Sequence, residues 1–143
     1  AFDPNSYTAL IQIWDNLFNR DEIIRVPSLR IDGHGGGAIA WSPDGQRIAV
    51  NELGGFVVYN LDADTLLSFP YEDSTTALAW SPDGTRLAMG GSRIRIWDTT
   101  IWRIIQEIPF AASSLRWSLD SHYLYSDRGE NGLARHSVVS VDD

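Results

Sequence analysis

Two short strings in the sequence carry residue types that could do chemistry. Residues 34–37 read His-Gly-Gly-Gly, and the backbone N–H groups of such a string can form an oxyanion hole when a Gly-x-Ser-x-Gly nucleophile turn accompanies it. The sequence contains no such turn, so we predict a flexible loop there and no ester hydrolysis. Residues 60–65 place oxygen-bearing side chains at alternate positions, but Thr65 and Tyr71 stand where a calcium loop needs glycine and glutamate. This segment is predicted to be a turn that ends a strand.

The other titratable residues do not converge on a catalytic or metal-binding set. His34, His122 and His136 lie at unrelated positions, which does not match the ligand spacing of metal sites. Cysteine is absent, which excludes disulfides, thiolate metal sites and cysteine nucleophiles. We therefore expect no cofactor, no bound metal and no enzymatic activity in these residues.

The charge balance argues against two classes of partner. The 143 residues include 19 acidic and 11 basic ones, for a net charge of −8, and every basic residue is an arginine that stands apart from the others. Nucleic-acid binding needs clustered positive charge, so we expect no nucleic-acid partner. No apolar run approaches the ~20 residues of a membrane-spanning helix, so no membrane insertion is expected. The composition indicates a soluble, acidic, β-type chain, and it leaves the cellular compartment open.

A five-residue string recurs at a regular interval. Residues 41–45 read Trp-Ser-Pro-Asp-Gly, residues 80–84 repeat the string, and residues 117–121 carry the decayed form Trp-Ser-Leu-Asp-Ser. A second string, Ile-Arg-Ile-Trp-Asp at residues 94–98, has counterparts at residues 56–60 and 11–15. Two separate markers with one period, near 39 residues, indicate an internal structural repeat.

Each repeat is predicted to be a four-stranded antiparallel meander. Residues 38–41 and 77–80 are apolar runs of strand length that alternate large and small side chains, which is typical of a strand buried on both faces. The Ser-Pro-Asp-Gly string that follows has the residue order of a type I turn, with serine first, proline second and glycine fourth. Asp44, Asp83 and Asp120 recur because this turn recurs.

These markers resemble the WD40 β-propeller family, in which each repeat supplies one four-stranded blade. The resemblance covers about residues 9–139 and rests on the agreement of turn, strand and period. It implies an all-β fold, an arc of about three to four four-stranded antiparallel blades that does not close on itself. The hydrogen-bonded set of the best-formed family repeats, which links a Gly-His pair to a hydroxyl and the Trp, is incomplete here. Blade stiffness is therefore expected to come mainly from apolar packing.

The resemblance also implies a division of the chain. We expect the last two strands of a first blade at about 9–28, full blades at about 37–71 and 75–110, and an incomplete last blade at about 113–139. Closed propellers have about four to eight blades. The arc is therefore expected to be completed by further chain, by a second copy of itself or by another subunit.

The last blade differs from its predecessors at three positions expected in the core. Arg116 stands where the earlier blades carry alanine, Arg135 where they carry valine or isoleucine, and His136 where they carry tyrosine or tryptophan. Two interpretations are open. The blade is either a degenerate terminal repeat whose outer face meets solvent or a surface that meets a partner bearing carboxylates.

The tryptophans have a structural interpretation. Five of them stand at repeat-equivalent strand positions and are expected to pack in the core: Trp14, Trp41, Trp80, Trp97 and Trp117. Trp102 lies in a connection between strands, where we expect it to be partly exposed and to pack on a neighbouring blade.

The expected function is a non-enzymatic protein–protein interaction or scaffold module that binds protein partners or a second copy of itself. In this family partners usually dock on the loops at the narrow face, which implies as candidates Arg30, His34, Tyr71, Glu72, Asp73 and Arg93. Arg116, Arg135 and His136 complete the predicted partner-binding set. The alternative is a sensor or gating piece of a larger enzyme, such as a hydrolase or a signalling ATPase, whose catalytic part lies outside this chain.

Overall fold

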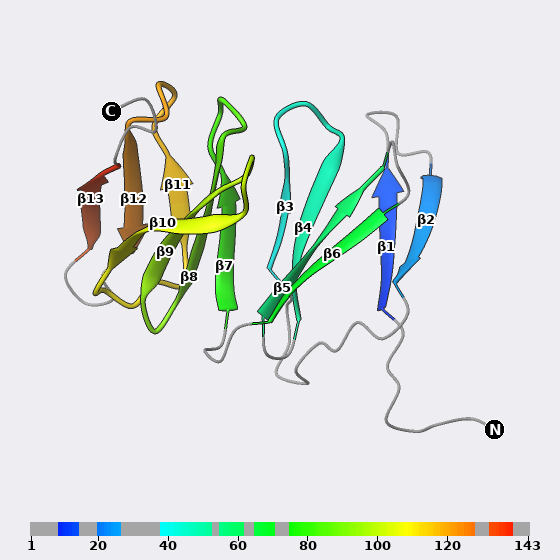
Figure 1. Ribbon diagram of the computed structural model, residues 1–143, viewed down its shortest axis with the longest axis horizontal. Coiled ribbons are helices and arrows are strands. Elements are labelled where there is room, and N and C mark those ends of the chain that lie inside the picture. The colour runs from blue at the N-terminus through cyan, green and yellow to red at the C-terminus, as the bar shows by residue number, and fades with distance from the viewer. Residues whose placement is uncertain are drawn as a thin grey trace. The chain divides into compact units, whose positions relative to one another are not determined.

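The computed structural model describes residues 9–14, 20–26, 38–52, 55–61, 65–70, 75–127 and 132–138. The regular structure of these residues consists of strands (Figure 1). The described residues contain no helix that is long and apolar enough to cross a membrane. The chain divides into two compact units, Ala1–Gly35 and Gly36–Asp143. The described part of the first unit is an antiparallel pair of strands, β1 (Ala9–Trp14) and β2 (Arg20–Val26).

The second unit contains three antiparallel sheets, in each of which consecutive strands are neighbours. Sheet I comprises β3 (Ile39–Trp41), β4 (Arg47–Glu52), β5 (Gly55–Asn60) and β6 (Thr65–Pro70). Sheet II comprises β7 (Thr75–Trp80), β8 (Arg86–Gly91), β9 (Ile94–Asp98) and β10 (Arg103–Ile108). Sheet III comprises β11 (Leu115–Trp117), β12 (Tyr123–Asp127) and β13 (Leu133–Ser137). The fold is all-β, and none of the three sheets closes into a barrel, as expected of a partial propeller arc.

The Ser-Pro-Asp-Gly strings form the turn that the sequence predicts between the first two strands of a sheet. The Gly45 N–H donates to the Ser42 carbonyl oxygen at 2.9 Å, and Gly45 has a φ of 73°, which glycine adopts without steric cost. The Asp44 carboxylate accepts hydrogen bonds from Ser42 Oγ at 2.5 Å and from the Gln46 N–H at 3.0 Å. Residues 81–86 and 118–123 repeat this network around Asp83 and Asp120.

The decayed turn of sheet III offers a stabilising substitution. Leu119 occupies the place of Pro43 and Pro82, and its side chain is 96% exposed. Leu119→Pro should raise the free energy of unfolding by about 0.4–1 kcal/mol, because proline restricts the unfolded chain while fitting the native turn. Urea denaturation followed by tryptophan fluorescence measures the change. Leu119→Ala is the matched control and should change little, and a destabilised Leu119→Pro variant would show that this turn departs from the other two.

Acid should weaken the turns. Hydrogen bonds from Ser42 and Ser118 lower the pKa of Asp44 and Asp120 below the ordinary aspartate value. Burial acts to raise the pKa of Asp83, but hydrogen bonds from Ser81 and Thr85 outweigh it and the net shift is downward. A carboxyl whose pKa is lower in the folded state stabilises the fold above its unfolded pKa, near 4, and this stabilisation is lost as the pH falls through the folded pKa.

Urea midpoints should therefore be level from pH 7 to about 5 and fall below about 4. The urea midpoint of the Asp83→Asn variant should be lower than that of the unsubstituted chain at pH 7, and it should fall less on acidification. Equal acid losses in the two proteins would contradict a role for the Asp83 carboxylate.

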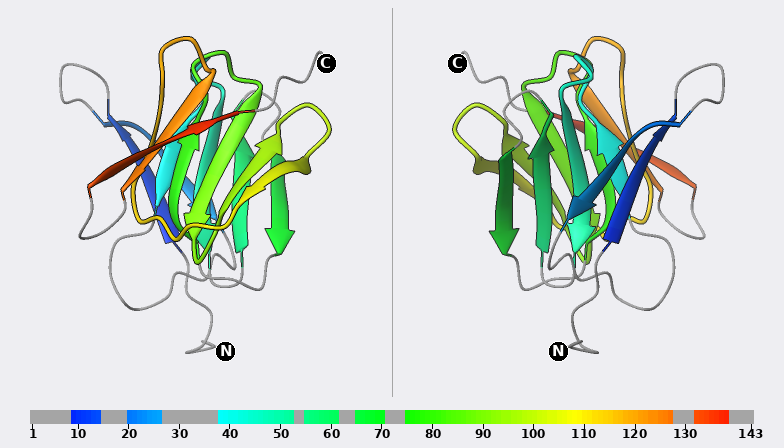
Figure 2. Two further views of the ribbon diagram at one scale, coloured as in Figure 1. Left: turned by 90° about the vertical axis from the view of Figure 1, so that its left-hand side faces the viewer. Right: turned by 90° about the vertical axis from the view of Figure 1, so that its right-hand side faces the viewer.

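Two apolar clusters hold the three sheets together. Between sheets I and II, Phe56 stacks on Phe69 with ring centroids 4.9 Å apart and meets Trp97 edge-on at 5.2 Å. Between sheets II and III, the buried side chains belong to Ala77, Ala88, Ile94, Ile96, Ile108, Ala112, Leu115 and Leu124. The three sheets thus pack face to face in chain order (Figures 1 and 2).

The tryptophans mostly fulfil their expected roles. Trp80 and Trp97 are core residues, and Trp117 packs against the cluster between sheets II and III. Trp102 is partly exposed and stacks on Phe69 of the preceding sheet at 4.7 Å, as predicted. The Trp14 side chain lies outside the described residues.

The expectation for residues 38–41 is wrong in part. Ile39 and Trp41 are 52% and 43% exposed, so the strand is not buried on both faces. Alternate residues of a strand point to opposite faces, and it is Ala40, between them, that packs against sheet II. The face of β3 that carries Ile39 and Trp41 therefore points away from sheet II.

Candidate functional site

Strand pairing in sheet III brings the two arginines of the last blade into one row. Arg116 of β11 is paired with Tyr125 of β12, which is paired in turn with Arg135 of β13. Directly paired residues share a face of the sheet. Both arginines are exposed and Tyr125 is partly buried. We call Arg116, Tyr125 and Arg135 the outer row.

The equivalent rows of the other two sheets are covered. They are Ala40, Ala49 and Val58 in sheet I and Ala79, Ala88 and Ile96 in sheet II. Each of these six residues belongs to, or packs against, the apolar cluster between its own sheet and the next sheet in the chain. Two alanines and one aliphatic side chain in each of these rows allow the next sheet to approach closely, whereas Arg-Tyr-Arg at the same positions does not.

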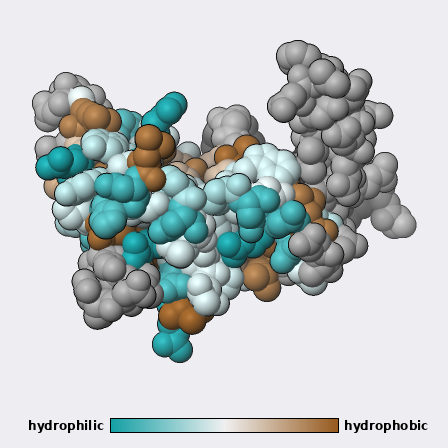
Figure 3. Space-filling model, turned by 90° about the horizontal axis from the view of Figure 1, so that it is seen from above, coloured by the Kyte–Doolittle hydropathy of each residue, from teal (hydrophilic) through white to brown (hydrophobic). Residues whose placement is uncertain are grey.

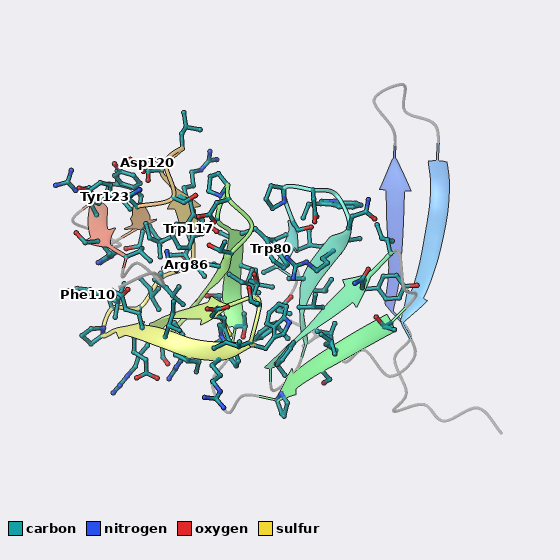
Figure 4. The ribbon with its side chains drawn as sticks, turned by 45° about the horizontal axis from the view of Figure 1, so that its top comes forward. Trp80, Arg86, Phe110, Trp117, Asp120 and Tyr123 are labelled. Atoms are coloured by element: carbon teal, nitrogen blue, oxygen red, sulfur yellow. The ribbon has the colours of Figure 1, made fainter. Side chains whose placement is uncertain are left out.

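The opposite face of sheet III packs on sheet II. Leu115 and Leu124 are buried in the shared cluster. The Trp117 indole N–H donates to the Ala79 carbonyl oxygen at 2.9 Å, as the Trp80 indole N–H does to the Ala40 carbonyl oxygen at 3.1 Å. Figure 4 shows both indoles on the side that faces the preceding sheet. The outer row therefore points away from sheet II.

A groove of about 390 Å³ lies beside the outer row. Its lining residues are Ser114, Arg116, Trp117, Tyr125, Ser126, Asp127 and Leu133. The Asp127 carboxylate accepts hydrogen bonds from Ser113 Oγ at 2.6 Å and from the Ser113 and Ser114 N–H groups at 3.0 Å. The Ser113 hydroxyl in particular lowers the Asp127 pKa below the ordinary value. This carboxylate is thus used to fix the start of sheet III, and no ion pair joins it to Arg116.

Arg135 and His136 lie on opposite faces of β13. The Arg135 guanidinium stacks over the Tyr123 ring at 4.8 Å, a contact that orders its side chain. His136 is adjacent to Arg135 in the strand, and its Nε2 lies 2.8 Å from Ser126 Oγ on the face toward sheet II. The structure brings Arg116 and Arg135 together and leaves His136 out of their row.

The contact between Ser126 and His136 resembles that of a serine nucleophile and its base. The Ser126 side chain, however, is only 1% exposed. Burial keeps substrate from its hydroxyl, so the contact is structural. Among the residues that the structure describes, no three His, Asp or Glu side chains form a group that could hold a metal ion.

Of the predicted loop residues, the structure places Arg93, in the turn between β8 and β9. Its Nη1 lies 4.0 Å from Glu107 Oε2, and the same carboxylate receives Arg95 Nε at 3.2 Å. Arg30, His34, Tyr71, Glu72 and Asp73 lie outside the described residues. Arg93 belongs to sheet II and is not part of the outer row.

Tyr125 and Leu133 belong to this surface, although the sequence reasoning did not single them out. Leu133 is 72% exposed. The signal was present in the repeat alignment, because Tyr125 stands at the position of Ala49 and Ala88 and Leu133 at that of Ile94. Seen from above (Figure 3), the described surface carries hydrophobic residues in small separate groups among hydrophilic ones.

Residues 65–98 match the family model described as WD domain, G-beta repeat. The matched residues comprise β6 of sheet I and β7, β8 and β9 of sheet II, so the matched stretch spans two neighbouring sheets. No curated protein sequence matches the chain with significance. WD40 repeats generally occur in non-catalytic modules that bind protein partners.

The hydrogen-bonded set of the best-formed WD40 repeats is incomplete in residues 65–98, as expected. The Trp97 indole N–H and the Thr75 hydroxyl are buried, and neither has a hydrogen-bond partner within the described part of the chain. Trp97 instead contributes its ring to the aromatic cluster with Phe56 and Phe69. Apolar packing therefore stabilises this part of the fold, whereas in more regular repeats hydrogen bonds contribute as well.

Proposed function

We propose that this chain is a non-enzymatic protein-interaction or scaffold module, an arc of WD40-type blades that is completed by further chain, by a second copy or by another subunit. The observation that carries the proposal is the exposure of the outer row. Its equivalents in sheets I and II are core positions that the next sheet covers. A sheet face of this kind is built to receive a partner.

The edge of sheet III supports the same proposal. In sheets I and II the third strand pairs with a fourth one, as β5 does with β6 and β9 with β10. Within the described residues β13 pairs with β12 alone. A sheet with three described strands, where its neighbours have four, can gain a fourth strand from another chain. The edge of the last blade, like its outer face, is therefore a candidate for association.

The loop candidates remain proposed partner-binding residues. In an antiparallel meander the β8–β9 turn, which carries Arg93, lies at the end of sheet II where β7 begins. Tyr71, Glu72 and Asp73 precede β7 in the chain. We include these residues in the proposed partner-binding set because loops at the end of a rigid sheet commonly carry binding residues. Arg30 and His34, which belong to the first unit, stay in the set as separate candidates.

Size-exclusion chromatography with light scattering, run over a range of protein concentrations, tests whether the arc needs completion. We expect a mass above the 16.0 kDa of one chain, rising with concentration. A cooperative, stable monomer of 16.0 kDa at every concentration would contradict the need for completion.

A further inference from the structure

We infer that the outer face of sheet III binds an extended acidic segment of another protein, whose carboxylates pair with Arg116 and Arg135. This inference rests on the proposed interaction function and specifies the chemistry of one partner. It concerns the outer row, the exposed Leu133 and the groove between them.

The two arginines are available for an anionic partner. Within the described residues neither Arg116 nor Arg135 forms an ion pair. Asp127, the acidic residue of the groove, is already held by Ser113 and Ser114. Arg95, by contrast, is buried and paired with Glu107. The described residues of this face include two arginines and one aspartate, and an excess of arginine favours the approach of negative charge.

An apolar blade is a poor occupant of this face. Sheet III covers the row of sheet II that contains Ala79 and Ile96. If another sheet covered the outer row in the same way, it would bury the guanidinium groups of Arg116 and Arg135, which stand at the equivalent positions. Burial of a charged group without a counter-charge is strongly unfavourable. The occupant must therefore supply carboxylates. A second copy packed through the same face is disfavoured as that occupant, because it would set the arginines of one outer row against those of the other.

The spacing of the row defines the partner further. Arg116 and Arg135 are on strands two apart, so their backbones are separated by roughly 10 Å. In an extended segment with acidic residues at alternate positions, same-side carboxylates stand roughly 7 and 13 Å apart, which brackets that separation. Guanidinium groups bind carboxylates through two parallel hydrogen bonds. The ring of Tyr125 between the arginines and the exposed Leu133 add apolar contact for the segment.

Fluorescence anisotropy with the full chain and a labelled Glu-Val-Glu-Val-Glu peptide tests the inference. We expect saturable binding that weakens with added salt and no binding of the Gln-Val-Gln-Val-Gln analogue. Arg116→Gln and Arg135→Gln should each weaken binding about tenfold, the effect of losing one charge-assisted hydrogen-bonded pair. Arg103→Gln is the matched control, because Arg103 is exposed on β10 and its loss changes the net charge equally.

Three results would overturn the inference: no binding of the acidic peptide, equal binding of the glutamine analogue, or equal weakening by Arg103→Gln. Thermal unfolding of each variant confirms that the substitutions leave the fold intact. Light scattering separates this inference from the proposed function. If the chain assembles but does not bind the acidic peptide, the inference fails while the proposed interaction function stands.

Discussion

The Ile96→Arg variant should lose about 4–5 kcal/mol of free energy of unfolding, or fail to fold. Ile96 is fully buried in the cluster between sheets II and III. The substitution places there the side chain that sheet III carries at the equivalent position, Arg135. In sheet II that guanidinium would be buried without a carboxylate partner. Urea denaturation followed by tryptophan fluorescence, or the yield of folded protein, measures the loss.

The reciprocal exchange is the control. Arg135→Ile should change the free energy of unfolding by no more than about 0.5 kcal/mol, because Arg135 is exposed and forms no ion pair in the described structure. The difference between the two losses in free energy of unfolding shows that position 96 is buried while the equivalent position 135 is open. If Arg135→Ile also cost several kcal/mol, the face of sheet III would be closed in the free chain and the proposed binding surface would be wrong.

Phe56→Ala should cost about 3–5 kcal/mol. Phe56 is a large, fully buried side chain, and it contacts both Phe69 and Trp97 in the cluster between sheets I and II. Its removal leaves a cavity lined by rings that cannot collapse without breaking their stacking. Urea denaturation measures the loss, and Leu119→Ala at an exposed position serves as the control. A loss under about 1 kcal/mol would show that aromatic packing does not hold these two sheets together.

Features set by local chemistry were predictable from the sequence. The turn at residues 42–45 follows from the residue order Ser-Pro-Asp-Gly, and Ser121 adopts the same left-handed conformation, with a φ of 63°, where glycine is lost. The four-stranded meander follows from the recurrence of that turn at one period. The incomplete hydrogen-bonded set around Trp97 was likewise visible in the residues that the repeats lack.

Features set by what covers a strand were not predictable in the same way. Ile39 and Trp41 are apolar, yet they are 52% and 43% exposed, because an apolar pattern shows which residues favour burial and does not show how far each one is covered. The separation of His136 from Arg135 follows from strand alternation, but only once the strand bounds and pairing are known. Tyr125 was overlooked because a tyrosine in a strand is unremarkable until its row is compared with the alanine rows of sheets I and II.

Hydroxyl-radical footprinting read by mass spectrometry tests most directly the central claim that the outer face of sheet III is an open binding surface. Leu133 and Ile94 occupy equivalent positions in sheets III and II, but Leu133 is 72% exposed and Ile94 is fully buried. In the free chain Leu133 should be readily oxidised while Ile94 is protected, and the acidic peptide should protect Leu133. Protection of Leu133 in the free chain to the same degree as Ile94 would contradict it.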